Sequence, residues 1–167
     1  MPTRSPGSKE TAKHAALRLL TIRSRSRREL AGRLRARGFA TAQVQEVVDE
    51  FSRLGFLNDA ALARNWARDR AARKGFGRRR INRELREKGI DERLIRDALD
   101  EVFRDLAEEA LARRVAQRRW VILRHLPPPT ARRRLAAYLN RRGFPPSLIR
   151  SLVEGMGHGE DEESVQE

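Results

Sequence analysis

Three glycines recur at nearly constant spacing and constrain the fold of this chain more than any other feature. Gly38, Gly89 and Gly143 lie 51 and then 54 residues apart, and each is followed by an aromatic or aliphatic residue. Before the glycines the apolar residues recur at the spacing of a helix, and after them the spacing i, i+3, i+4, i+7 begins again. A repeat of this length is typical of stacked supersecondary units. We therefore predict an all-α fold of three tandem three-helix repeats, each read as helix, helix, glycine turn, helix. The alternative is one irregular helical domain in which the repetition is accidental.

The repeat boundaries follow from the same pattern. We expect a disordered leader over 1–8, repeats over 9–54, 57–103 and 105–156, and an acidic disordered tail over 157–167. Ser26 and Glu29 have the spacing of a capping box, and Thr41 is expected to cap the next helix. The pattern predicts a first helix over about 9–22 and a long helix over 105–123. The prolines at 127–129 break that long helix, and Thr130 is expected to start the next one.

Basic residues outnumber acidic ones. The chain has 37 Lys and Arg against 23 Asp and Glu, a net charge of +14, and only 39% hydrophobic residues. So few apolar residues favour several thin cores in an elongated body over one large core. The arginine guanidinium forms paired hydrogen bonds to phosphate or carboxylate groups, so the positive charge indicates a polyanionic partner. Part of the arginine is also expected to be merely solvated.

Arginine clusters stand at the start of the second helix of each repeat. If the repeats stack in similar orientation, the clusters form a ladder along one side, and the helix amino termini beneath them offer free N–H groups to phosphate. The alternative is scattered charge on unrelated faces. The predicted binding residues are Arg25, Arg27, Arg28, Arg73, Lys74, Arg78, Arg79, Arg80, Arg83, Arg132, Arg133 and Arg134.

The sequence offers little for catalysis. The three histidines lie far apart, cysteine is absent, and no complete phosphate-binding loop is present. We expect no enzyme activity, no cofactor and no metal. No apolar run could cross a membrane and no secretory signal is seen, so a cytoplasmic protein without membrane contact is expected. Trp66 and Trp120 are expected to pack, although tryptophan can also stack on bases.

The acidic tail has two possible roles. Six acids lie between Glu154 and Glu167, with no Lys or Arg among them. Solubilisation is the simpler interpretation, and competition with polyanions for the basic face is the other.

These segments resemble the RecX family of RecA regulators. The resemblance covers about residues 12 to 156. It is carried by ALRLLTIRSRSRREL (16–30), GFLND (55–59), RKGFG (73–77) with Arg80-Ile81, Glu84-Leu85 and Lys88-Gly89-Ile90, and LNRRGF (139–144). Asn58 stands where aspartate is usual in the family, and Leu62 where an aromatic residue is commoner.

The resemblance implies a curved, elongated body that binds along the groove of the RecA–DNA filament and inhibits strand exchange and ATP hydrolysis. It implies a monomer that modulates DNA repair, homologous recombination and the SOS response, and that binds single- and double-stranded DNA weakly by itself. Two alternatives stay open. One is a sequence-tolerant nucleic-acid-binding protein that acts without RecA, and the other is a scaffold whose basic face meets a different acidic protein.

Overall fold

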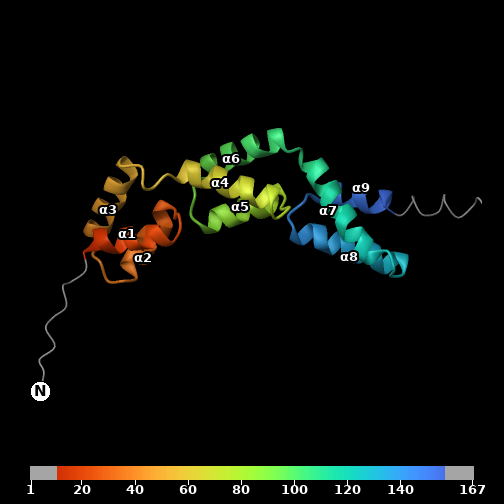
Figure 1. Ribbon diagram of the computed structural model, residues 1–167, viewed down its shortest axis with the longest axis horizontal. Helices are drawn as coiled ribbons and strands as arrows, with labels where there is room; N and C mark the ends of the chain where they lie inside the picture. Colours follow the sequence, from red (N-terminus) through yellow and green to blue (C-terminus); the bar gives the residue numbers. More distant parts are fainter. Residues whose placement is uncertain (1–10, 157–167) are drawn as a thin grey trace, which may run out of the picture.

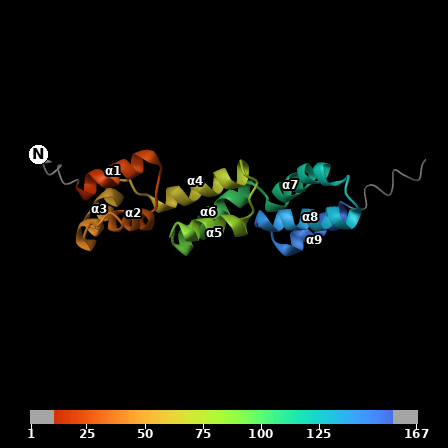
Figure 2. The ribbon, with the colours of Figure 1, turned by 90° about the horizontal axis from the view of Figure 1, so that it is seen from below.

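The chain forms a rod of three helical modules (Figures 1 and 2). The computed structural model describes residues 11–156. Within that range there are nine helices and no strand: α1 (Ala12–Ile22), α2 (Arg27–Arg35) and α3 (Thr41–Arg53) form module 1; α4 (Asp59–Ala72), α5 (Arg78–Glu87) and α6 (Glu92–Asp105) form module 2; α7 (Glu108–Leu123), α8 (Pro128–Arg141) and α9 (Pro146–Gly155) form module 3. The predicted fold class is confirmed. The expected leader over 1–8 and tail over 157–167 lie outside the described residues. No helix in the described range is long and apolar enough to span a membrane.

Helix starts follow local capping chemistry. The predicted capping box is present, because the Ser26 hydroxyl accepts the Glu29 N–H and the Glu29 carboxylate accepts the Ser26 N–H. Thr41 is not a cap as expected. Ala40 holds the N-cap position of α3, and its N–H donates to the Gln43 side chain at 3.1 Å.

Three predicted helix starts were wrong. The first helix begins at Ala12, where Thr11 is the N-cap. The predicted long helix over about 105–123 is the single helix α7, which ends at Leu123 as predicted but begins only at Glu108, because α6 continues to Asp105. The helix predicted to start at Thr130 begins at Pro128. Proline fits the first turn because the N–H it lacks has no partner within the helix there.

The three repeated glycines end the second helix of each module. Their φ angles are +87° for Gly38, +73° for Gly89 and +85° for Gly143, the left-handed region that glycine adopts at least cost. In each turn the N–H of the following residue donates to a leucine carbonyl five residues earlier, as in Phe144 to Leu139 at 3.3 Å. The predicted helix ends at these glycines are confirmed.

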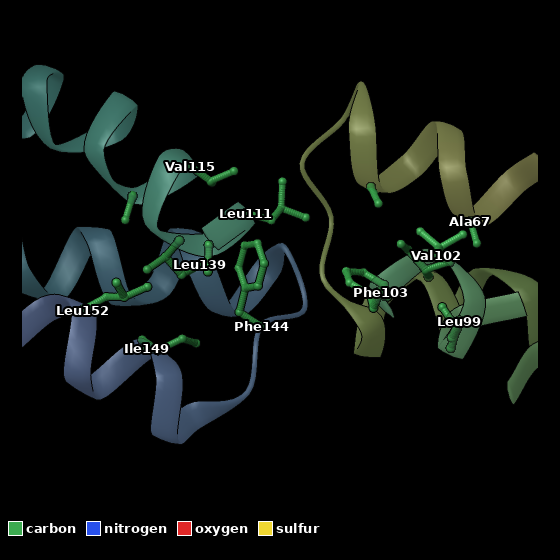
Figure 3. Packing of buried hydrophobic residues seen from close by; sticks show 14 of the residues in the cluster. Ala67, Leu99, Val102, Phe103, Leu111, Val115, Leu139, Phe144, Ile149 and Leu152 are labelled. Atoms are coloured by element: carbon green, nitrogen blue, oxygen red, sulfur yellow. The ribbon is translucent and has the colours of Figure 1, made fainter. Parts of the chain in front are cut away.

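The apolar side chains form two cores. Module 1 has its own, around Leu30, Leu34 and Phe51. Modules 2 and 3 share a second cluster, in which Phe103 of α6 lies on the side facing Leu111 and Phe144 (Figure 3).

Three apolar residues that fall at helical spacing in the sequence, and were expected to be buried, prove exposed. Leu17 is 43% exposed, Leu54 57% and Ile122 56%. Ala15, Leu19 and Leu123 are buried at neighbouring positions, so the buried faces of α1 and α7 are rotated from those the sequence pattern indicated.

Successive modules are held by a recurring contact, which we call a joint. In the first joint, between modules 1 and 2, the Arg27 N–H donates to the Asp59 carboxylate at 3.0 Å and the Ser26 hydroxyl donates to the Lys88 carbonyl. The second joint, between modules 2 and 3, repeats this plan. The Arg78 N–H donates to the Glu108 carboxylate at 2.8 Å, and the Gly77 N–H donates to the Arg142 carbonyl at 2.8 Å.

Each joint therefore has the same two halves. One half is the first turn of the second helix of a module. The other half comes from the next module, as a carboxylate at the first position of its first helix and a carbonyl of its glycine turn. Because the halves recur in register, the second helices α2, α5 and α8 follow one another along the same side of the rod (Figures 1 and 2).

Candidate polyanion-binding face

The first arginine cluster is divided by the fold. Arg25 is buried, 9% exposed, and its Nε donates to the Leu19 carbonyl at 3.1 Å. It therefore ties α2 to α1 and is withdrawn from the surface. Arg27 and Arg28 are exposed at the start of α2.

The middle cluster contains both paired and unpaired arginines. Arg78 lies 2.7 Å from Asp100, and its guanidinium sits over the Phe103 ring. Arg83 is 3.9 Å from Glu87, with both side chains exposed. Arg79 is exposed, and it forms no ion pair within the described part of the chain. An unpaired arginine can bind phosphate without first breaking an ion pair, so Arg79 is more available to a new anion than the paired Arg78 and Arg83.

Arg80 is held in place by its neighbours. It lies 3.3 Å from Glu84 and 3.8 Å from the centroid of the Phe76 ring, and its Nη1 donates to the Arg141 carbonyl at 3.0 Å. Burial favours the protonated form of Glu84, but hydrogen bonds from Arg70, Trp66 and Arg80 outweigh it and lower the pKa of Glu84. Glu84 thus stays ionised and anchors the cations around it.

A groove of about 530 Å³ runs between α5 and α8 beside the second joint. It is lined by Arg79, Arg80, Arg83, Asn140, Arg141 and Gly143. Four of these are arginines from two modules, and no carboxylate is part of the lining. Charge focused in a concave site attracts anions more strongly than the same charge on a flat surface. The groove is therefore the candidate anion site.

Two groove residues escaped sequence reasoning. Arg141 is exposed, and it forms no ion pair among residues 11–156; Asn140 adds an amide at the same edge. Both lie at the carboxyl end of α8, whereas most of the predicted residues lie at helix starts. The sequence signal was available, because the glycine turn after α8 follows an Arg-Arg pair.

The helix amino termini of the first two modules offer fewer free N–H groups to phosphate than expected. At α2 the Ser26 N–H donates to Glu29 and the Arg27 N–H donates across the joint to Asp59. At α5 the first-turn N–H groups donate across the joint to Glu108 and to the glycine turn of module 3. At α8 the corresponding positions are Pro127, Pro128 and Pro129, which have no N–H. Anion binding on this side of the rod therefore falls to arginine side chains.

The remaining predicted residues are spread along the rod. Arg132, Arg133 and Arg134 are exposed near the start of α8 and form no ion pair within the described residues. Arg73 is exposed and lies 3.5 Å from Asp69. Lys74 is exposed, and its carbonyl accepts a hydrogen bond from Arg142. These five residues are exposed on modules 2 and 3 but do not line one common pocket.

Trp66 is packed, as expected. Its Nε1 donates to Glu84 at 2.9 Å, and the cationic groups of Arg70 and Lys88 each lie 4.0 Å from its ring centroid. Trp120 also packs against the shared core of modules 2 and 3. Within residues 11–156 no group of His, Asp and Glu has the arrangement of a metal site.

Comparison with known proteins agrees with the modular division. Three family models match in tandem: the first, second and third three-helix domains of RecX, over residues 12–51, 58–99 and 107–153. Curated relatives carry the description "Regulatory protein RecX". One from Thermobifida fusca is 37% identical and covers 85% of this chain and 76% of its own length. Another from Streptomyces coelicolor is 36% identical, and the aligned part covers 98% of this chain and 87% of the relative.

Solved structures show the same fold. RecX from Lactobacillus salivarius superposes with a TM-score of 0.74 at 20% identity, covering 87% of this chain and 94% of its own. A second structure, of regulatory protein RecX, superposes with a TM-score of 0.73 at 22% identity, covering 86% of this chain and 70% of its own. The family models span most of the described chain, and the curated relatives are more than a third identical to it over the aligned residues, so this chain belongs to the RecX family.

Proposed function

We propose that this protein binds the RecA–DNA filament and inhibits its recombinase and ATPase activities. Its family membership supports RecA as the partner. The observation that carries the proposal is the groove between α5 and α8, where the unpaired Arg79 and Arg141 from two modules face the same space. In the cell this activity modulates homologous recombination, DNA repair and the SOS response from the cytoplasm, by binding and without catalysis.

The shape of the rod suits a repeating polymer. Modules in series on one chain contact successive subunits, and each contact after the first is intramolecular, so weak contacts combine through effective concentration. The arginines of α2, α5 and α8 follow the same side of the rod. They are suited both to phosphate oxygens and to carboxylates on the filament protein. We assign the groove as the centre of the contact, with Arg27, Arg28 and Arg132–Arg134 extending it towards the two ends.

The experiment measures RecA-catalysed ATP hydrolysis on single-stranded DNA with increasing amounts of the protein. We expect substoichiometric protein to inhibit hydrolysis, and the double variant Arg79→Glu/Arg141→Glu to need at least about 100-fold more protein, since each hydrogen bond to a charged group is worth about 1.5–3 kcal/mol. The matched control is Arg93→Glu/Arg104→Glu, which makes the same charge change at exposed positions on α6. Equal loss of inhibition in both variants would show that only net charge matters. An unaffected ATPase rate with wild-type protein would refute the proposal.

A second function rests on the same unpaired arginines, which fit phosphate without any protein partner. In that case the protein is a sequence-tolerant nucleic-acid-binding module. Its affinity for DNA alone would then fall steeply with salt, with a slope set by the number of phosphates contacted. Recovery of RecA with the immobilised protein at moderate salt, after nuclease treatment, favours the first function over the second.

A further inference from the structure

The two joints show what a module must present in order to receive its successor. The first turn of the receiving helix supplies donors at the N-cap and at the next two positions. In the second joint these are the N–H groups of Gly77, Arg78 and Arg79, which donate to Arg142, Glu108 and Gly143 at 2.8, 2.8 and 3.2 Å. We call this first turn the socket.

The first joint uses the same socket with one exchange. The Ser26 N–H is taken by Glu29 of its own capping box, so the Ser26 hydroxyl replaces it as the donor to the glycine-turn carbonyl. The Arg27 N–H keeps its role and binds the incoming carboxylate of Asp59. Donors at the N-cap and at the first helical position are therefore common to both joints.

Module 3 has a socket position with no donors in it. The three matching residues of α8 are Pro127, Pro128 and Pro129, and proline has neither a backbone N–H nor a polar side chain. The helix itself is not harmed, because proline is favourable in the first turn. What is removed is the ability to receive another module.

The opposite end of the rod lacks the matching carboxylate. Asp59 and Glu108 occupy the first position of α4 and α7, whereas Ala12 occupies it in α1. A second copy approaching α8 with its first module would bring no acid to a socket without donors. A carbonyl buried there without a partner costs about 1–3 kcal/mol.

We propose that the prolines at the start of α8 and the alanine at the start of α1 close the rod at both ends, so that a second copy of this chain cannot join it head to tail. The need for closure follows from symmetry. A head-to-tail contact that does not return to its start generates an open filament, and this chain already contains that contact twice. The α8 prolines therefore keep the arginine face on a single rod.

The first test moves proline into a working socket. Arg78→Pro/Arg79→Pro removes two N–H donors, and Arg78→Ala/Arg79→Ala removes the same side chains but keeps the donors. We expect the Gly77 amide, which donates to Arg142 across the joint, to exchange with solvent at least about tenfold faster in the proline variant. The alanine variant should exchange close to the wild-type rate, with equal helix content by circular dichroism. Equal exchange in the two variants would overturn the proposal.

The second test opens the closed end. The variant Pro127→Ser/Pro128→Arg/Pro129→Arg copies Ser26-Arg27-Arg28, and Ala12→Asp restores the carboxylate. Sedimentation equilibrium up to millimolar protein should show one 19.2 kDa species for the wild type and concentration-dependent association for the fourfold variant. Ala12→Asp alone, with the prolines retained, should stay monomeric. Association of the wild type, or a fourfold variant that is fully helical and as monomeric as the wild type, would overturn the proposal.

Discussion

The two joints share a plan and differ in what reinforces it. Across the first, the cores of modules 1 and 2 remain separate clusters, and a bridge between Lys88 and Glu29 at 3.3 Å adds to the hydrogen bonds. Across the second, modules 2 and 3 share one apolar cluster, and backbone lies directly against backbone at Gly143 and Arg80. The first joint is therefore polar and ionic, and the second is apolar and tightly packed.

This difference predicts how the rod responds to stress. Ionic contacts weaken with salt and acid, whereas apolar burial does not. We expect modules 2 and 3 to unfold as one cooperative unit, and module 1 to separate from them under milder conditions.

The largest effect is expected at the second joint from Gly143→Ala. A Cβ there would lie 2.3 Å from the Arg80 nitrogen and 2.9 Å from its Cα, at a φ of +85°. Backbone cannot move aside as a side chain can, so we expect a loss of about 3 kcal/mol or more in the free energy of unfolding. The control is Gly38→Ala, which has a φ of +87° but no neighbour within 4 Å, and should lose about 1 kcal/mol. Urea unfolding measures both, and equal losses would remove the contrast between the two positions.

Gly89→Val should fall between these two. Its Cβ would meet the Arg28 side chain rather than backbone, and a long side chain can rotate away. The strain of a β-branched residue at φ +73° remains, so we expect about 2 kcal/mol, assigned to the middle module by amide exchange. A loss as large as that of Gly143→Ala would mean that the first joint is packed as rigidly as the second.

Substitutions of the joint carboxylates Asp59 and Glu108 can test separately what their charge and their hydrogen bonds contribute. Burial raises the pKa of both Asp59 and Glu108, even though each accepts an N–H across its joint. Asp59→Asn and Glu108→Gln keep an acceptor oxygen and remove the charge, so we expect changes within about 0.5 kcal/mol. Asp59→Ala and Glu108→Ala should each cost about 1–2 kcal/mol in thermal or urea unfolding. Alanine variants as stable as the amide variants would show that these acceptors contribute nothing to the joints.

Acid should loosen the first joint at a pH set by Glu29. Burial favours protonated Glu29, but hydrogen bonds from Arg23 and Ser26 and the charge of Lys88 outweigh it and lower the pKa of Glu29 below its ordinary value of 4.5. A carboxyl with a depressed folded-state pKa contributes stability above its unfolded pKa and loses it as the pH falls through the folded value. Arg23 and Ser26 belong to module 1, so only the charge of Lys88 ties the ionisation of Glu29 to the joint. We therefore expect the first joint to weaken as the pH falls below about 4.5, while modules 2 and 3 stay joined. Fluorescence energy transfer between two introduced cysteines, one in each part, measures this, with Glu29→Gln as the control that should remove the dependence.

The smallest effect is expected from salt. Lys88 is only 11% exposed, so screening reaches its bridge to Glu29 less than it reaches the exposed pairs. Lys88→Met should cost the first joint about 1 kcal/mol or less and remove its salt response, measured by the same energy transfer. If the Lys88→Met variant keeps the full salt response, the salt dependence of the first joint comes from another ion pair.

The sequence by itself determined the number of modules, their class and most of their helix ends. The reason is local: glycine favours positive φ, Ser26 and Glu29 cap each other within four residues, and apolar spacing at 3.6 residues per turn defines a buried face. Short-range chemistry of this kind does not need the rest of the molecule.

Only the tertiary structure decided which polar groups remain available. Arg25 and Arg27 are two residues apart, yet one is buried against α1 and the other is exposed. The amino termini of α2 and α5, expected to bind phosphate, are contacted by the next module. Arg141 and Arg79 line the same groove although they are more than sixty positions apart. Each outcome depends on how one module is rotated against its neighbour. That rotation is set by contacts between distant residues, which the spacing of residues within a single helix does not encode.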